Sequence, residues 1–242
     1  MRWLALALLI GAATAAAADG RRAGFEDMSP ATQALQRDDT QNPAWLWVDD
    51  GEKRFNNDCA ACHPARSLRG VATRYPAFDP VLGKPVTLAA RINLCRQRHL
   101  ETNPLAEQGD ELLALEAYVA LQSRGQPIAA PVDTRLKPFL EQGQRLYNQR
   151  MGQLDFSCAQ CHDQHAGGRL AGSVIPQAHP TGYPIYRLEW QGMGGLQRRL
   201  RNCMTAVRAE PFAYGSDEYT ALELYLMQRA AGMALEAPAV RP

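Results

Sequence analysis

Cys59-Ala-Ala-Cys62-His63 and Cys158-Ala-Gln-Cys161-His162 are the two stretches that decide the fold of this chain. In a c-type haem motif the two thiols form thioether bonds to the haem, and the adjacent histidine becomes the proximal iron ligand. One copy alone is also compatible with a zinc half-site or a redox dithiol. Two copies behind an export signal favour haem. We therefore predict two covalently bound haem c groups, attached through Cys59, Cys62, Cys158 and Cys161, with His63 and His162 as axial ligands.

The N-terminus has the layout of a secretory signal peptide. A short positive start, Met1-Arg2, precedes an apolar run from Leu4 to Ile10, and Ala16-Ala17-Ala18 resembles a cleavage site. The run is too short and too rich in alanine for a convincing membrane span. We predict that residues 1–18 are a signal peptide and that the mature protein is periplasmic. No later stretch is apolar enough to cross a bilayer, so we expect no membrane span in the mature protein.

Length and charge restrict the function classes. The chain has 242 residues and a formal net charge of +1. A mature chain of this size has room for two small domains. A nucleic-acid-binding protein usually has a strong basic excess, so this class is excluded.

An internal duplication explains why the haem motif occurs twice. A Gly-x-x-x-aromatic-Asn segment precedes each motif, at Gly51–Asn56 and Gly143–Asn148. A helical Leu-Glu-x-Tyr segment follows each motif, at Leu115–Tyr118 and Leu222–Tyr225. The leucine and tyrosine of this segment lie three residues apart and therefore share one helical face.

The two remaining cysteines also form a pair. Cys95 and Cys203 each lie in an arginine-rich, helical context, about 20 residues before the Leu-Glu-x-Tyr segment. Two spare cysteines in an exported protein ordinarily suggest a disulfide. A bond between equivalent points of separate domains has no obvious role, so one cysteine for each haem is the simpler interpretation.

These landmarks predict a mainly α fold with two tandem cytochrome c-like domains and an extended N-terminal arm. The arm would span residues 19–48, with Trp45 and Trp47 as its anchors. The first haem domain would span residues 49–124, and a linker rich in glycine and proline would span residues 125–133. The second, catalytic haem domain would span residues 134–242.

Each haem iron also needs a ligand on its distal side. The first half offers Cys95 and His99, and no methionine occurs between His63 and Met151. The second half offers His165, His179, Met193, Cys203 and Met204. Only Cys203 has a counterpart at the same place in the first half, so symmetry favours Cys95 and Cys203. A buried, unreactive thiol is the alternative for both.

The sequence resembles the SoxA family, the catalytic subunits of the SoxAX cytochromes of thiosulfate oxidation. The resemblance extends over nearly the whole mature chain and is densest from Tyr183 to Met233. It is carried by the runs Tyr186-Arg-Leu-Glu-Trp190-Gln, Leu196-Gln-Arg-Arg-Leu-Arg-Asn-Cys203, Val207-Arg-Ala-Glu-Pro211-Phe-Ala-Tyr214-Gly-Ser216 and Glu218-Tyr219-Thr-Ala-Leu-Glu-Leu-Tyr225.

The resemblance implies an enzyme, L-cysteine S-thiosulfotransferase. Such an enzyme couples thiosulfate oxidatively to a cysteine of the SoxYZ carrier protein and releases two electrons. The implied partners are a SoxX-type monohaem cytochrome c, which forms a heterodimer with the chain, the SoxYZ carrier, and a soluble cytochrome c acceptor. The implied site residues are Cys95 and Cys203 as axial ligands, Cys203 as the active-site cysteine with a persulfide intermediate, and Arg199 as the substrate-binding residue.

The physical chemistry of these residues agrees with the resemblance. Arg199 and Cys203 are four residues apart, so they share a helical face. A guanidinium offers two parallel donors to a dianion such as thiosulfate. Arg208 lies close behind the cysteine in the sequence and would add a second positive charge. Two other functions remain open, a dihaem thiosulfate dehydrogenase that forms tetrathionate and a non-catalytic electron-transfer cytochrome c.

Overall fold

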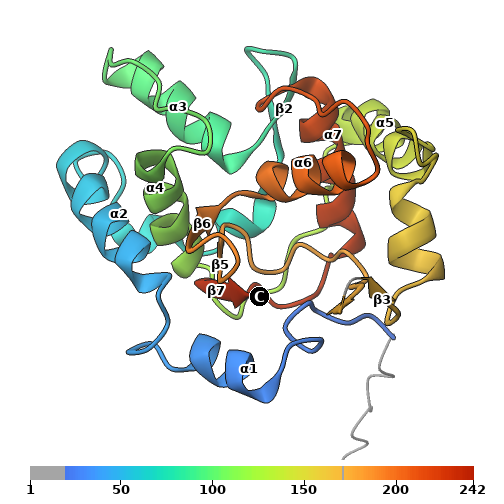
Figure 1. The fold of residues 1–242 in the computed structure, drawn as a ribbon. Coiled ribbons are helices and arrows are strands. Elements are labelled where there is room, and N and C mark those ends of the chain that lie inside the picture. The colour runs from blue at the N-terminus through green and yellow to red at the C-terminus, as the bar shows by residue number, and fades with distance from the viewer. Residues whose placement is uncertain (1–19, 171) are drawn as a thin grey trace, which may run out of the picture.

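A computed structural model describes residues 20–170 and 172–242 of the chain (Figure 1). The signal peptide predicted at residues 1–18 lies outside this range. The mainly α fold class is confirmed. The α-helices are α1 (Pro30–Arg37), α2 (Trp45–Asp58), α3 (Leu88–His99), α4 (Asp110–Leu121), α5 (Lys137–Asn148), α6 (Leu196–Ala206) and α7 (Asp217–Arg229). In the part of the chain that is described, no helix has the length and apolarity that a membrane crossing requires.

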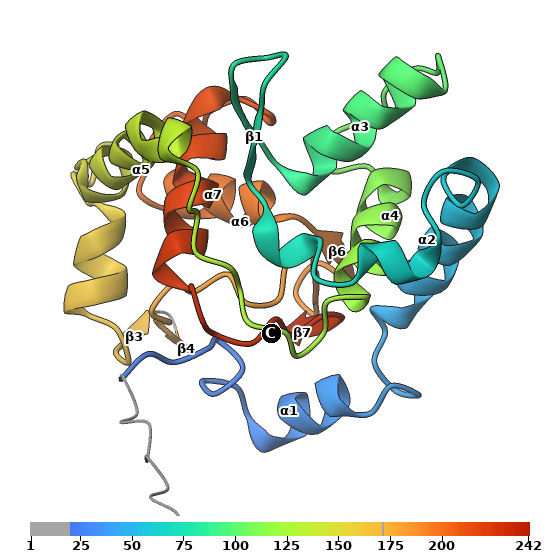
Figure 2. The ribbon, with the colours of Figure 1, turned by 180° about the vertical axis from the view of Figure 1, so that it is seen from behind.

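The strands are short and lie between the helices. They are β1 (Ala77–Asp79), β2 (Lys84–Val86), β3 (Arg169–Leu170), β4 (Ser173–Val174), β5 (Ile185–Arg187), β6 (Gly192–Gly194) and β7 (Ala239–Arg241). Helices α2, α3 and α4 lie on one side of the molecule, and α5, α6 and α7 lie on the other, as views from the front and from behind both show (Figures 1 and 2). The duplicated sequence therefore forms two groups of three helices.

The two landmarks of the first half pack directly against each other. Helix α2 crosses α4 where Gly51 meets Ala114, so closely that a Cβ atom on Gly51 would lie 2.0 Å from the Ala114 carbonyl oxygen. One turn later, the rings of Phe55 and Tyr118 are in contact, with centroids 5.2 Å apart. Glycine and the aromatic ring recur in the sequence because this helix crossing needs both of them.

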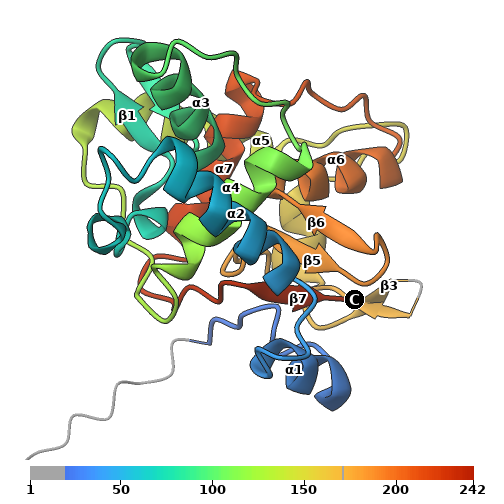
Figure 3. The ribbon, with the colours of Figure 1, turned by 90° about the vertical axis from the view of Figure 1, so that its left-hand side faces the viewer.

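The second half repeats this crossing. Helix α5 meets α7 at Gly143, where an added Cβ atom would lie 2.1 Å from the carbonyl oxygen of Ala221. The rings of Tyr147 and Tyr225 lie 5.4 Å apart. The side-on view shows the equivalent crossing of α2 and α4 in the foreground (Figure 3).

A β-hairpin leads into the cysteine-bearing helix of each domain. Strand β1 pairs antiparallel with β2 before α3, and β5 pairs antiparallel with β6 before α6. Each hairpin also contacts the last helix of the other domain, β2 against α7 and β6 against α4. Tyr186, Met193 and Val240 of the second half belong to the same buried cluster as α2 and α4 of the first half. The two domains therefore share a core.

The N-terminal segment crosses beneath both domains, as expected for an arm (Figure 1). It is less extended than expected, because it contains α1, which begins after the N-cap residue Ser29. The Gln36 side chain accepts hydrogen bonds from the Val240 backbone and the Arg241 guanidinium, which attaches the arm to the C-terminal strand. Trp45 and Trp47 lie in the first turn of α2 rather than in the arm, and Trp47 packs on Tyr186.

Two glutamates line a small cavity between the domains. Glu116 and Glu223 are the second residues of the two Leu-Glu-x-Tyr segments, and the cavity has a volume of about 60 Å³. Burial raises the pKa of Glu223 to about 7. A hydrogen bond from Gln197 lowers this pKa, and the charge of nearby Glu107 raises it. Burial and the charge of Glu223 also raise the pKa of Glu116. The folded state therefore holds protons on these two carboxyl groups to a higher pH than the unfolded chain does.

Replacing Glu223 with glutamine is expected to remove part of the pH dependence of stability. An unfolded glutamate ionises near pH 4.5, and Glu223 of the folded chain ionises near pH 7. The folded state therefore binds more protons within this window, and its stability decreases as the pH rises through it. The contribution of Glu223 is on the order of 2–3 kcal/mol. Urea unfolding of the wild type and the Glu223→Gln variant between pH 5 and pH 8 would measure the difference.

The exposed Glu101 provides the control for this measurement. The Glu101→Gln variant should follow the wild-type pH dependence, because its carboxyl group faces water in both states. Identical pH profiles for wild type and Glu223→Gln would contradict the assignment of a raised pKa to the buried carboxyl group.

Candidate functional site

The second domain brings Cys203 to His162. Cys203 lies in α6, and His162 lies in a π-helical turn, η4 (Gln160–Gln164), which begins within the second Cys-x-x-Cys motif. The Nδ1 atom of His162 donates a hydrogen bond to the Pro176 carbonyl oxygen at 2.7 Å. A backbone acceptor of this kind orients a metal-binding histidine and fixes its tautomer.

The electrostatic surroundings favour the thiolate form of Cys203. Burial alone would raise its pKa, but a hydrogen bond from His162 and the positive charges of Arg199 and Arg187 lower the pKa below its ordinary value. Cys158 behaves differently, because burial raises its pKa to about 12. Cys203 is therefore the sulfur in this domain that is prepared to act as a ligand or a nucleophile.

The first domain brings Cys95 to the first motif. Cys95 lies in α3. Burial and the charge of Asp58 raise the pKa of Cys59, and the nearby Cys95 adds a smaller contribution. The Arg96 guanidinium binds the Asp58 carboxylate at 2.6 Å, which ties α3 to the end of α2. All six cysteines are free, and none forms a disulfide.

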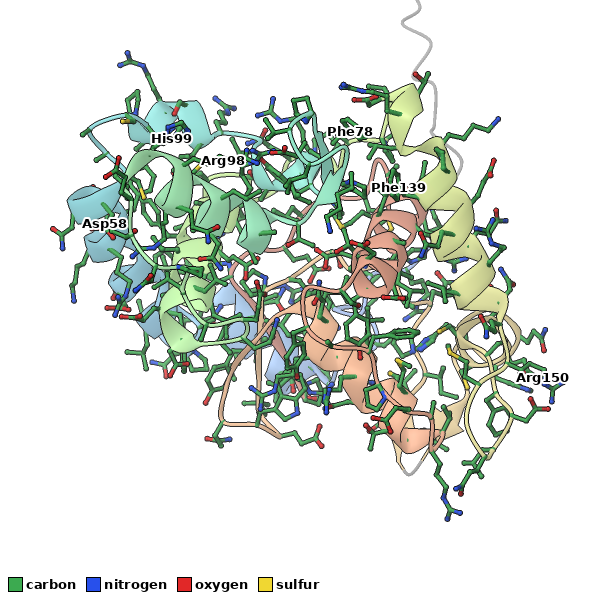
Figure 4. The ribbon with its side chains drawn as sticks, turned by 90° about the horizontal axis from the view of Figure 1, so that it is seen from above. Asp58, Phe78, Arg98, His99, Phe139 and Arg150 are labelled. Atoms are coloured by element: carbon green, nitrogen blue, oxygen red, sulfur yellow. The ribbon has the colours of Figure 1, made fainter. Side chains whose placement is uncertain are left out.

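The other candidate ligands lie elsewhere. Met193 and Met204 are buried, and the Met204 sulfur accepts a hydrogen bond from the Tyr219 hydroxyl. His179 donates a hydrogen bond to the Arg22 carbonyl on the arm, and His165 is exposed. His99 is exposed at the outer end of α3, on the side opposite Arg150 of the second domain (Figure 4).

The arginines of α6 separate into different roles. Arg199 lies close to Cys203 and to the partly buried Tyr183, whose pKa is raised by burial against the opposing charge of Arg199. Arg198 stacks on Trp190 and Arg201 stacks on Tyr214, and neither is among the groups that lower the pKa of Cys203.

Arg208 does not take the place that its position in the sequence suggested. It is exposed in the turn after α6 and has a positive φ of 58°. The second guanidinium that acts on Cys203 is that of Arg187, from strand β5. No motif in the sequence indicates Arg187, because it comes from the hairpin rather than from the helix that bears the cysteine.

The residues around both motifs fit a c-type haem. Each motif supplies two thiols and a histidine, and each has a further cysteine nearby. Arg96, next to Cys95, and Arg229, which binds Asp163 at 2.6 Å, each hold a buried Nε–H group without an acceptor. Buried donors ordinarily have partners, and the carboxylates of a haem would provide them.

Known proteins with similar sequences include a family of cytochrome c domains. The profile of the family described as SoxA/TsdA, cytochrome c domain, matches residues 45–128 and 142–235. The chain is similar to the L-cysteine S-thiosulfotransferase subunit SoxA of Allochromatium vinosum, with 38% identity over 90% of this chain and 75% of that protein. The SoxA protein of Paracoccus pantotrophus is 33% identical over 90% of this chain and 78% of that protein.

A solved structure shows the same fold. The crystal structure of SoxXA from Paracoccus pantotrophus superimposes with a TM-score of 0.88 and 33% sequence identity, over 92% of this chain and 87% of that one. The cytochrome c domain match implies covalently bound haem c.

Proposed function

The chain belongs to the SoxA/TsdA cytochrome c family, and from this premise we propose how its residues perform thiosulfate oxidation. It is an L-cysteine S-thiosulfotransferase subunit, like its SoxA relatives. The reaction joins the outer sulfur of thiosulfate to a cysteine thiolate of a SoxYZ carrier, which gives a cysteine S-thiosulfonate. One sulfur–sulfur bond forms and two electrons leave, one to each of two oxidised cytochromes.

The arrangement of His162, Cys203 and Arg199 is the observation that supports this function best. A cysteine held as thiolate lies beside the motif histidine, and a guanidinium lies one helical turn before it. An electron-transfer cytochrome needs no guanidinium next to its axial ligand. Because the SoxA relatives are named as thiosulfotransferases, transfer to a carrier is also favoured over tetrathionate formation.

Arg199 binds the sulfonate oxygens of thiosulfate in this scheme. Its guanidinium offers two parallel donors and directs the outer sulfur towards Cys203 on the same helical face. Cys203 forms a bond to that sulfur as two electrons are removed. The carrier thiolate then attacks the same sulfur, and Cys203 leaves as thiolate, so the exchange is balanced. A persulfide on Cys203 would act in the same way through its terminal sulfur.

Two haem c groups are proposed, one for each motif. The first would be held by Cys59 and Cys62, with His63 and Cys95 as the residues that would bind its iron. The second would be held by Cys158 and Cys161, with His162 and Cys203 as the residues that would bind its iron. Haem c supplies one-electron redox chemistry when it is bound. Only the second site has a substrate role, so the first haem domain is assigned a structural one.

The proposed partners follow from the family. The solved relative is a SoxXA complex, which supports a heterodimer of this chain with a SoxX-type monohaem cytochrome c. The SoxYZ carrier and a soluble cytochrome c acceptor complete the reaction. The predicted signal peptide places the mature protein in the periplasm, where such partners would meet it.

Replacing Arg199 with alanine should weaken thiosulfate turnover without removing either haem. The guanidinium binds the dianion but forms no bond to iron. Charge-assisted hydrogen bonds contribute about 1.5–3 kcal/mol, so kcat/KM should fall about ten- to a hundred-fold. Thiosulfonation of the purified carrier, followed by mass spectrometry with a cytochrome acceptor present, would measure the change and would test the proposed function in the wild type.

Two further variants sharpen this test. Arg199→Lys should recover only part of the activity, because an ammonium group cannot bind in the two-pronged way. Arg208→Ala should retain nearly all of it, because Arg208 is exposed beyond the end of α6. Wild-type kinetics in Arg199→Ala with an unchanged absorption spectrum would place the substrate site elsewhere.

A further inference from the structure

The two domains can be compared residue by residue around their cysteine-bearing helices. Strand register aligns the hairpins, since Asp79 pairs with Lys84 and Arg187 pairs with Gly192. A constant separation of 108 residues relates equivalent positions of the two domains. The pairs are Tyr75 and Tyr183, Asp79 and Arg187, Arg91 and Arg199, and Cys95 and Cys203. Differences at these positions therefore distinguish two otherwise equivalent sites.

In the first domain the arginine of this set is neutralised within the protein. The Asp79 carboxylate is completely buried and binds Arg91 at 2.8 Å and Arg98 at 2.9 Å. The hydrogen bond from Arg98 is the largest of the effects that hold the pKa of Asp79 well below its usual range. Because Arg91 already binds a buried carboxylate of the protein, its guanidinium is less available to an external anion than an unpaired one would be.

In the second domain a guanidinium replaces that carboxylate. Arg187 occupies the position of Asp79, so its side chain leaves the strand towards the helix that carries Arg199 and Cys203. Among the described residues, no carboxylate forms an ion pair with Arg199. Arg187 itself has one acidic partner, Glu189 at 2.6 Å, and the Glu189 side chain is 62% exposed.

Arg187 is held in place and has unused hydrogen-bonding capacity. Its guanidinium stacks on Trp190 at 5.1 Å, and Arg198 covers the same ring at 4.2 Å. The side chain is only 14% exposed, and its buried Nε–H group has no acceptor within residues 20–170 and 172–242. Glu189 offsets only part of the positive charge from its exposed position. Thiosulfate is a dianion, and its sulfonate oxygens can accept hydrogen bonds from both guanidiniums.

We propose that Arg187 is a second substrate-binding residue, which together with Arg199 binds the sulfonate group of thiosulfate beside Cys203. The same comparison explains why the first haem site has no substrate role, because Asp79 occupies the place where the second guanidinium would be needed. This inference rests on the proposed function, since thiosulfate is the anion that the second site is expected to accept.

The test compares thiosulfate binding and turnover across four variants of the holoprotein. Arg187→Gln should raise both the Kd and the KM for thiosulfate about ten-fold or more. Arg187→Asp, which recreates the first-domain pattern, should raise them further. Arg187→Lys should restore part of the affinity. Arg198→Gln is the matched control, because Arg198 stacks on the same ring, and it should stay within about three-fold of wild type. Isothermal titration calorimetry with thiosulfate would give the Kd.

Spectra and redox titration separate the alternatives. If Arg187→Gln left the Kd and KM unchanged but shifted the midpoint potential of the second haem, the guanidinium would serve the haem carboxylates, and the proposal would be overturned. Wild-type behaviour in every measurement would overturn it as well. A wild-type protein that bound thiosulfate without transferring it to the carrier would instead contradict the proposed function, and the binding comparison would still test Arg187.

Discussion

Cys203→Ala is expected to abolish carrier thiosulfonation and to change the ligation of the second haem. The substitution removes the thiolate that lies beside His162, and with it the atom that we propose bonds to the substrate sulfur. Loss of a nucleophile ordinarily reduces turnover by at least about a thousand-fold. The carrier assay would record the loss of activity, and electron paramagnetic resonance would record the change at iron. Intact mass should still equal the mature polypeptide plus two haems, because the thioether bonds do not involve Cys203.

Cys95→Ala is the matched control for this experiment. Cys95 holds the equivalent position in the first domain, where Arg91 is neutralised by Asp79. The variant should change only the signal of the first haem and should retain thiosulfonation. Full activity in Cys203→Ala, or loss of activity in Cys95→Ala alone, would show that the catalytic domain has been assigned wrongly.

Gly143→Ala is expected to destabilise the second domain by about 3 kcal/mol or more. An added methyl group would lie 2.1 Å from the Ala221 carbonyl oxygen and 2.7 Å from the Tyr225 Cβ atom, so α5 and α7 would have to move apart. The result would be diagnostic, because replacing an unconstrained helical glycine with alanine normally stabilises a helix by up to about 1 kcal/mol. Thermal unfolding followed by circular dichroism, together with the yield of haem-loaded protein, would measure the effect.

The neighbouring Gln144 provides the control, because its side chain is exposed on the same helix. Gln144→Ala should unfold within a few degrees of wild type. An unchanged or raised unfolding temperature in Gly143→Ala would mean that the helices do not cross as closely as described.

The repeated landmarks could be interpreted from the sequence because each crossing of two helices requires a glycine and an aromatic residue at a fixed spacing. Gly51 and Gly143 recur where two helices touch, and each precedes an aromatic residue that packs on a tyrosine of the last helix. The order of these segments was sufficient to predict a mainly α fold of two related halves. The start of α2 at Trp45 was not predicted, because its N-cap residue Ala44 makes no side-chain capping hydrogen bond and therefore leaves no signal in the sequence.

The pairing of each spare cysteine with a haem motif was also predictable. Cys95 and Cys203 keep a nearly constant distance to the last helix of their halves, and the i, i+4 spacing places Arg199 on the same helical face as Cys203. Arg187 lies outside these local patterns. Alignment of the two halves nevertheless places Arg187 opposite Asp79, so an arginine of the second half replaces an aspartate of the first.

The sequence by itself determined which residues can bind haem and which cysteine shares a helix face with Arg199, because covalent motifs and helical spacing are local properties. Only the tertiary structure decided that Arg187, rather than Arg208, brings the second positive charge to Cys203. Arg208 is close in sequence but follows the end of α6 into solvent, whereas Arg187 is brought to the site by the pairing of β5 with β6 and by the packing of that hairpin on α4. Contacts of this kind depend on where separate elements meet, and no local pattern encodes that meeting point.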